Sequence, residues 1–100
     1  MKTAIRLLEN LKGHIHPADF YRAELPAMPP TRGNGWRDGG LCVFHDDNHA
    51  GSFRVNLETG AFVCFACGTK GGDIISFVQQ RDCLSFPEAL EKLSEDWGVA

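Results

Sequence analysis

The 100-residue sequence predicts an α+β fold in which a short antiparallel β-sheet is flanked by N-terminal and C-terminal helices. Near both ends, apolar residues recur every three or four positions, as on one face of an amphipathic helix. In the middle of the chain, apolar and polar residues alternate, which is typical of a half-buried strand. Because a chain this short rarely builds two cores, we expect a single domain over residues 1–100.

Two helices are predicted for the N-terminal segment, about residues 3–25. Apolar positions from Thr3 to Lys12 have helical spacing, and Gly13 supplies a stop signal. Pro17 suits the first turn of a second helix, where its missing N–H costs no hydrogen bond. The proline-rich segment 26–30 cannot continue that helix and is expected to form a stiff connector.

A β-sheet is predicted for about residues 31–70. A glycine-rich turn precedes a strand around Trp36. Residues 52–57 alternate between apolar and polar, residues 58–60 offer a turn, and residues 61–65 return, which predicts a β-hairpin. The hairpin brings the segments on its two flanks close together.

Two further helices are predicted for about residues 72–97. Asp73 lies at the expected start of the first, where a carboxylate is favourable at the positive end of the helix dipole, and this helix runs to about Arg81. Ser85 and Glu88 have the spacing of a capping box, in which each side chain bonds a backbone N–H of the other. The apolar residues that follow predict an amphipathic helix at the end of the domain.

The charge of the chain restricts its partners. The formal net charge is −3, and residues 71–100 hold six Asp or Glu against two Lys or Arg. Proteins that bind nucleic acid through phosphate contacts alone carry an excess of cations, so any nucleic-acid contact must be local. No apolar run reaches the roughly 20 residues of a membrane span, and the N-terminus lacks a signal-peptide pattern. We therefore expect a cytoplasmic protein with reduced thiols and no membrane partner.

Two pairs of metal-ligand residues flank the hairpin: Cys42 and His45 precede it, and Cys64 and Cys67 end it. Two residues between the members of each pair allow a tight knuckle, and two knuckles complete a tetrahedron around zinc. We therefore expect a zinc ribbon with one Zn²⁺ per chain. Four protein ligands leave no open position, so the ion is expected to be structural and to supply about 10–16 kcal/mol of folding free energy, as in finger peptides.

Other interpretations compete with a closed zinc site. The cysteines can instead be buried as small apolar side chains or form disulfides in an exported protein, and a catalytic zinc would need an open position. His49 could compete for the metal, although a solvated loop position is the expectation. Cys83 has no partner at ligand spacing and is expected to pack as an apolar residue. His14 and His16 have no acidic or cysteine neighbour that would indicate catalysis.

Five short motifs lie between residues 41 and 90. They are Leu41-Cys42-Val43-Phe44-His45, Gly51-Ser52-Phe53-Arg54-Val55, Phe62-Val63-Cys64-Phe65-Ala66-Cys67-Gly68, Gly71-Gly72-Asp73-Ile74-Ile75-Ser76-Phe77 and Ser85-Phe86-Pro87-Glu88-Ala89-Leu90. Together they resemble the N-terminal zinc-binding domain of DnaG-type bacterial primases, whose zinc ligands are Cys-His-Cys-Cys. The resemblance implies a domain that grips single-stranded template, with a primase catalytic subunit, a helicase or another replication protein as partner.

The sequence departs from that family in two respects. Val43 and Gly51 stand where the family commonly has proline, which is expected to leave the metal site intact. A primase also needs a catalytic domain whose acidic residues hold magnesium, whereas this sequence ends at Ala100 and offers only the adjacent pair Asp46-Asp47. We therefore expect a stand-alone or detached domain that is not an enzyme and is at most an accessory to primase (DNA-directed RNA polymerase) activity.

The leading functional hypothesis is binding of single-stranded DNA in replication or priming. Bases stack on exposed aromatic rings while cations follow the backbone. The residues expected to contact DNA are Arg32, Trp36, Arg37, Arg54 and Lys70. Phe62 or Phe65 could join this surface, although the phenylalanines of a small domain are expected mostly in the core.

The alternative hypothesis is a zinc-ribbon adaptor for a replication or conjugation protein of a mobile element. Its docking surface would be the acidic face of the last helix, formed by Glu88, Glu91, Glu95 and Asp96. Charged helix faces are mostly solvated surface, which favours the first hypothesis.

Overall fold

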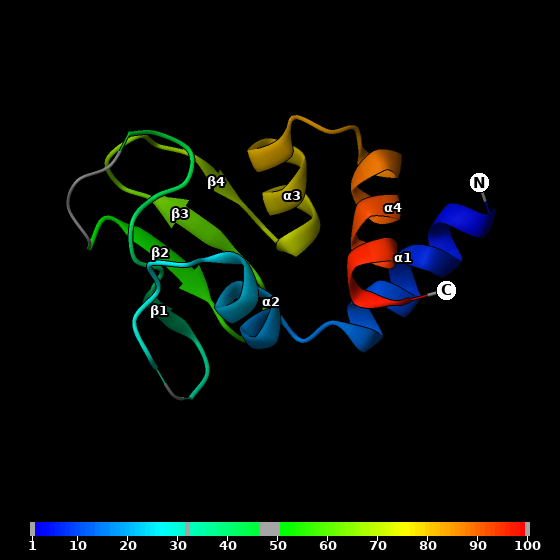
Figure 1. Ribbon diagram of the computed structural model, residues 1–100, viewed down its shortest axis with the longest axis horizontal. Helices are drawn as coiled ribbons and strands as arrows, with labels where there is room; N and C mark the ends of the chain where they lie inside the picture. The colour runs from blue at the N-terminus through cyan, green and yellow to red at the C-terminus, as the bar shows by residue number, and fades with distance from the viewer. Residues whose placement is uncertain (1, 32, 47–50, 100) are drawn as a thin grey trace.

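The computed structural model describes residues 2–31, 33–46 and 51–99, and it confirms the predicted α+β class. Within these ranges, four helices and four strands follow one another along the chain (Figure 1). In order, they are α1 (Lys2–His14), α2 (Pro17–Glu24), β1 (Trp36–Asp38), β2 (Phe53–Asn56), β3 (Phe62–Cys64), β4 (Lys70–Gly71), α3 (Ile74–Asp82) and α4 (Phe86–Trp97). None of the described helices is long and apolar enough to cross a membrane.

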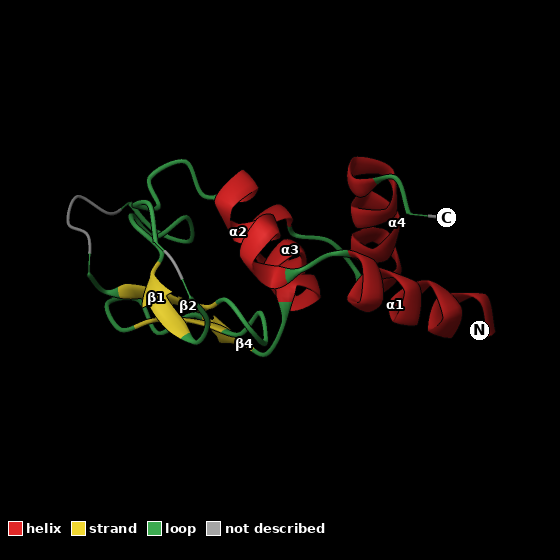
Figure 2. Ribbon diagram, turned by 90° about the horizontal axis from the view of Figure 1, so that it is seen from below, coloured by secondary structure: helices red, strands yellow, loops and turns green. Residues whose placement is uncertain are grey.

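The strands form one antiparallel sheet in the order β1-β2-β3-β4. Figure 2 shows α2 and α3 on the same side of this sheet. Helix α4 packs against α3 and α1, farther from the sheet (Figure 1). No helix among the described residues covers the opposite side of the sheet, so that face is open.

The strand register assigns the side chains of the sheet to its two faces, because cross-strand partners share a face. On the inner face, Val55 pairs with Phe62, and both side chains are buried. On the open face, Val63 pairs with Arg54 of β2 and with Lys70 of β4. The inner face therefore builds the core, and the open face presents a row of a cation, an apolar residue and a second cation.

Strand β4 was not among the strands expected from the sequence. It contains only Lys70 and Gly71, so it carries no alternating pattern. A Cβ atom on Gly71 would lie 2.5 Å from the Phe62 ring, so only glycine lets this edge strand approach β3 so closely.

Capping residues begin the two C-terminal helices as predicted. The Asp73 carboxylate accepts a hydrogen bond from the Ser76 N–H at 2.8 Å at the start of α3. Ser85 and Glu88 form the complete capping box of α4, with both reciprocal hydrogen bonds present. These bonds pair N–H groups that have no partner within the helix.

The first helix ends one residue later than Gly13 would indicate. It continues to His14 because Gly13 does not take the left-handed conformation that usually ends a helix at glycine. The helical hydrogen-bond pattern extends further still, since the Ile15 N–H donates to the Leu11 carbonyl at 2.8 Å.

Aromatic rings form the centre of the core between the sheet and the helices. The Phe77 ring of α3 lies edge-to-face with four rings at centroid distances of 5.3 to 5.7 Å, those of Phe20, Tyr21, Phe44 and Phe62. Such pairs contribute about 0.5–1.5 kcal/mol each beyond the burial of their area. Because Phe44 lies in the loop of the first predicted ligand pair, the cluster also ties that loop to the helices.

Tyr21 joins α2 to the turn of the hairpin through a buried hydrogen bond. Its hydroxyl donates to the Gly60 carbonyl at 2.5 Å. Burial, with a smaller contribution from the negative charge of Asp73, raises the pKa of Tyr21 well above its ordinary value of about 10. The folded protein therefore holds this phenol in its neutral form.

We expect Tyr21→Phe to lower the free energy of unfolding by about 1–3 kcal/mol, because the buried Gly60 carbonyl loses its donor. The raised pKa adds a pH dependence: above about pH 10 the unfolded phenol ionises while the folded one does not, so wild-type stability falls as pH rises. Tyr21 is the only tyrosine of the chain. Urea unfolding at pH 7 and above pH 10 should show a smaller alkaline loss in the variant, and equal losses in both proteins would contradict this assignment.

Candidate metal centre

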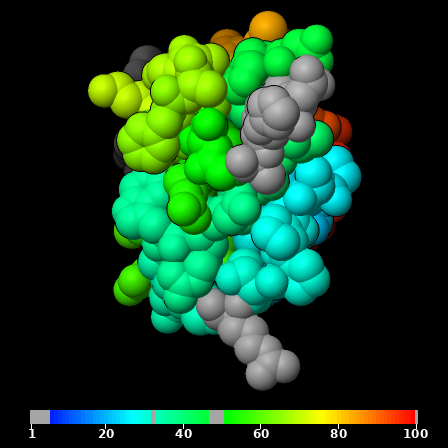
Figure 3. All heavy atoms as spheres, turned by 90° about the vertical axis from the view of Figure 1, so that its left-hand side faces the viewer, coloured from blue at the N-terminus to red at the C-terminus, as the bar shows by residue number. Residues whose placement is uncertain are grey.

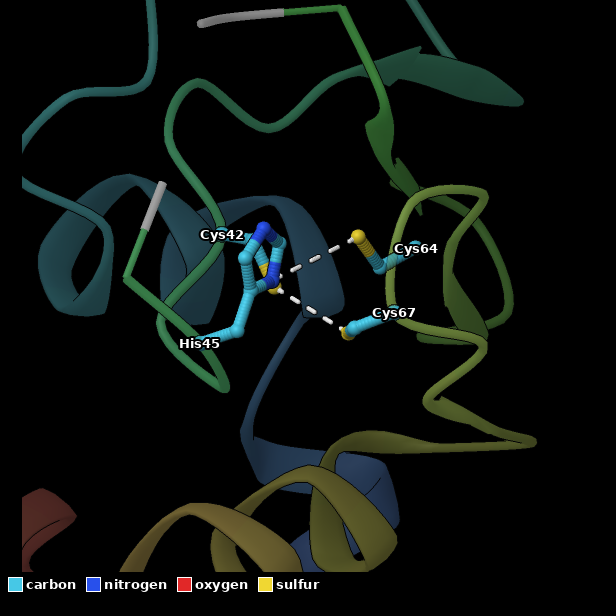
Figure 4. A group of neighbouring side chains, drawn as sticks. All are labelled: Cys42, His45, Cys64 and Cys67. Carbon is cyan, nitrogen blue, oxygen red and sulfur yellow. Dashed lines mark hydrogen bonds between the residues drawn. The ribbon is translucent and has the colours of Figure 1, made fainter. Parts of the chain in front are cut away.

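Four side chains from two separate segments converge at one end of the sheet (Figure 4). The ligand atoms of Cys42, His45, Cys64 and Cys67 all lie within 4.8 Å of one another. The Sγ atoms of Cys42 and Cys67 are 3.9 Å apart, and the Cys64 Sγ is 3.9 Å from the His45 Nδ1. Sulfur ligands about 2.3 Å from a tetrahedral zinc are about 3.8 Å apart, so this set of three sulfurs and one nitrogen fits zinc.

The loop that carries Cys42 and His45 is held by the connector on one side and by the core on the other. Gly40 has a φ of +81°, and a Cβ atom there would lie 2.3 Å from the Ala27 carbonyl oxygen, so only glycine lets the connector pack this closely. The Phe44 N–H donates to the Cys42 Sγ at 3.4 Å, which tightens the knuckle. The Phe44 ring then anchors the knuckle in the aromatic cluster.

The second ligand pair lies where β3 ends and turns. The Gly68 N–H donates to the Cys64 carbonyl at 2.8 Å, and the Cys64 N–H donates to the Thr69 carbonyl at 2.8 Å. Gly68 has a φ of +80°, which favours glycine at this turn. The turn directs the sulfurs of Cys64 and Cys67 toward the first loop (Figure 4).

The thiols of the site differ in acidity. Burial raises the pKa of Cys42 to about 12. A hydrogen bond from the Thr69 hydroxyl, 3.2 Å from the sulfur, lowers the pKa of Cys67 to about 6. The shift at Cys67 favours the thiolate, and the shift at Cys42 favours the protonated thiol. Because metals bind thiolates, metal binding must displace the proton of Cys42.

Among the described residues, neither Cys83 nor His16 joins this group. The expectation that Cys83 packs as an apolar residue is wrong: it is exposed, because it ends α3 in the left-handed conformation with a φ of +55°. His16 is an exposed capping residue whose Nδ1 accepts from the Ala18 N–H at 3.3 Å. His49 and Asp47 lie outside the described residues.

Three of the residues predicted to contact DNA share the open face of the sheet. Arg54 and Lys70 flank Val63 in register, and Trp36 lies two residues before Asp38, the β1 partner of Arg54. Alternation along a strand therefore places Trp36 on the same face. Figure 3 shows β1, β2 and the segment that follows β3 adjoining one another on the surface.

Of the two other residues predicted to contact DNA, Arg37 lies on the opposite side of β1. Arg37 pairs with the buried Val55, so its side chain leaves β1 on the opposite side from Trp36. The Arg37 Nη1 donates to the Trp36 carbonyl at 2.8 Å. Arg32 lies outside the described residues.

Phe65, whose sequence context is compatible with either the core or the surface, is a surface residue. Its side chain is 75% exposed, and that of Trp36 is 48% exposed. Trp36, Arg54, Val63 and Phe65 line a hollow of about 440 Å³ on the open face. The alternation of β3 carried the signal, because Phe62 points inward and the residue three positions later therefore points outward.

Comparisons with known proteins agree with one another. Residues 31–100 match the model of a family described as the CHC2 zinc finger, the zinc ribbon of DnaG. A DNA primase of Streptomyces coelicolor is 47% identical over 60% of this chain and 9% of its own length. A DNA primase of Lactococcus lactis is 40% identical over 93% of this chain, again a small part, 14%, of its own length. The crystal structure of the Aquifex aeolicus primase, with zinc-binding and RNA polymerase domains, matches 94% of this chain and 22% of that chain at 26% identity and a TM-score of 0.69.

Proposed function

The chain belongs to the CHC2 zinc-finger family of DnaG primases, and from this we propose that it binds single-stranded DNA in replication or priming. The observation that carries the proposal is the open face of the sheet, where exposed aromatic rings and cations lie together. We term this surface the open-face patch; it consists of Trp36, Arg54, Val63, Phe65 and Lys70.

We propose one structural Zn²⁺ per chain, held by Cys42, His45, Cys64 and Cys67. Four protein ligands leave no position for water, so the chemistry that a bound ion supplies is a cross-link between the first loop and the end of the hairpin. The open-face patch then depends on zinc, because Phe65 lies between the second pair of ligands in the sequence.

Stacking, more than net charge, drives the proposed binding. The formal net charge of −3 gives little long-range attraction for a polyanion. Each exposed ring can stack on a base, which is worth about 1–3 kcal/mol. Arg54 and Lys70 are exposed and form no ion pair with another described residue, so both are available to phosphates.

We propose that these 100 residues do not synthesise primers by themselves. Phosphoryl transfer needs carboxylates that hold magnesium. Among the described residues, the group of three cysteines and His45 is the one cluster of at least three His, Cys, Asp or Glu placed to hold a metal. The chain spans 9% to 14% of the length of curated relatives, so a catalytic subunit would have to supply the chemistry, with a helicase as a second class of cytoplasmic partner.

The adaptor alternative receives less support from the acidic face of α4. Glu88 is committed to the capping box, and Asp96 pairs with Lys92 at 3.0 Å. Glu91 and Glu95 are exposed. Binding of a basic protein surface without any binding of single-stranded DNA would establish this alternative.

We expect Trp36→Ala to weaken binding of a short single-stranded oligonucleotide about 5- to 150-fold, because it removes one stacking platform worth about 1–3 kcal/mol. Fluorescence anisotropy with a labelled oligonucleotide at low salt measures the change. Circular dichroism and zinc content should stay at wild-type values.

The matched control is Phe86→Ala, which removes an exposed aromatic ring (41% exposed) from α4, far from the patch. Its binding should equal that of wild type. Equal affinities of the Trp36 variant and wild type would refute the open-face patch as the binding surface.

A further inference from the structure

We infer that the open-face patch holds two consecutive nucleotides of a single strand, one on each side of Val63, an inference that rests on the proposed function. Val63 pairs with Arg54 on one side and with Lys70 on the other. Neighbouring strands lie about 4.8 Å apart, so the Cα atoms of the two cations are about 10 Å apart. One phosphate can therefore pair with each cation, with the apolar side chain between them.

Val63 lines two hollows on this face. The hollow toward β2 has a volume of about 440 Å³ and contains Arg54 with Trp36 and Phe65. The hollow toward β4 has a volume of about 580 Å³ and contains Lys70 with the same two rings. Both volumes lie in the range of about 300–1,000 Å³ that holds small ligands. Each hollow thus offers one cation and an aromatic surface, which are the two contacts that a nucleotide needs.

The charges along this row limit the number of nucleotides. The β1 partner of Arg54 is Asp38, whose carboxylate is fixed by a hydrogen bond from the Gly40 N–H at 2.9 Å. A carboxylate at this position repels a third phosphate. On the other side of Val63, Lys70 belongs to β4, the edge strand of the sheet, so no further described strand lies beyond it. The third cation in the described strands, Arg37, lies on the inner side.

The dependence of affinity on oligonucleotide length tests the inferred two-nucleotide footprint. The zinc-loaded chain, labelled with ¹⁵N, would be titrated by NMR with 5′-phosphorylated thymidine oligonucleotides of increasing length, pdT1 to pdT6. From pdT1 to pdT2 the affinity should rise at least about fivefold, because the second base gains a stacking position. The affinities for pdT3 and pdT4 should exceed that for pdT2 only about twofold and threefold. This increase is statistical, because a two-nucleotide site can be placed in two ways on pdT3 and in three ways on pdT4. For pdT4, log affinity against log salt should have a slope of about −1.4, the value for two phosphates.

A charge variant locates the second nucleotide. Lys70→Gln should reduce the gain in affinity from pdT1 to pdT2, because the second phosphate loses its cation while the second base keeps its stacking position. Arg6→Gln, which removes an exposed cation of α1, is the matched control and should leave the affinities for both lengths unchanged.

The outcomes separate the footprint from the proposed function. A further rise of fivefold or more from pdT2 to pdT3 would overturn the footprint and leave the proposed function standing. The same holds if Lys70→Gln keeps the full gain from pdT1 to pdT2. Absence of chemical-shift changes with every oligonucleotide at low salt would overturn the proposed function and the footprint together.

Discussion

Cys64→Ser is expected to leave most of the chain unfolded at room temperature. Cys64 is fully buried at the end of β3, and the substitution removes one of the four proposed zinc ligands. A structural zinc supplies about 10–16 kcal/mol in finger peptides, which is as large as the total stability of about 5–15 kcal/mol of an ordinary domain. Far-UV circular dichroism should show a large loss of helical signal, and elemental analysis should show less than one zinc per chain.

Cys83→Ser is the matched control for that result. It makes the same chemical change at an exposed residue that ends α3 and is not part of the ligand group. Its stability should stay within about 0.5 kcal/mol of wild type, with full zinc content. Equal unfolding of the two variants would show that the metal ligands are assigned wrongly.

Phe77→Ala is expected to lower the free energy of unfolding by about 3–5 kcal/mol even with zinc bound. The ring is fully buried and touches four other aromatic rings, so its removal leaves a large cavity. It also removes the surface on which the Arg81 guanidinium lies, 5.1 Å from the ring centroid, where Arg81 pairs with Glu24 of α2 at 3.0 Å. Urea unfolding in the presence of zinc measures the loss.

Phe86→Ala provides the comparison, because it truncates the same side chain at an exposed position at the start of α4. Its cost should be within about 0.5 kcal/mol. A cost for Phe77→Ala below about 1 kcal/mol, or one equal to that of the control, would contradict the central place of the aromatic cluster in the fold.

Much of the fold could be predicted because its determinants are local in sequence. The start of α4 follows from two side chains three residues apart, Ser85 and Glu88, and the hairpin follows from alternation on either side of a turn. The four candidate ligand residues were predicted from their spacing alone, since two knuckles need the same short separations wherever they occur. The structure groups the same four side chains.

The features that were not predicted depend on strand register, which cannot be read from the sequence. Arg37 lies on the inner face because it pairs with Val55. Strand β1 has only three residues, so no local sequence pattern predicts the face of this side chain. Strand β4 has two residues, and its pairing rests on the close approach of Gly71 to the Phe62 ring. Both features place residues of the open-face patch, so the patch could be predicted only in part.

Zinc K-edge X-ray absorption of the purified chain tests the proposed metal centre most directly. We expect a zinc shell of three sulfurs at about 2.3 Å and one nitrogen at about 2.0–2.1 Å, with no water. A shell that contains water oxygen or fewer than three sulfurs would contradict the closed site formed by Cys42, His45, Cys64 and Cys67.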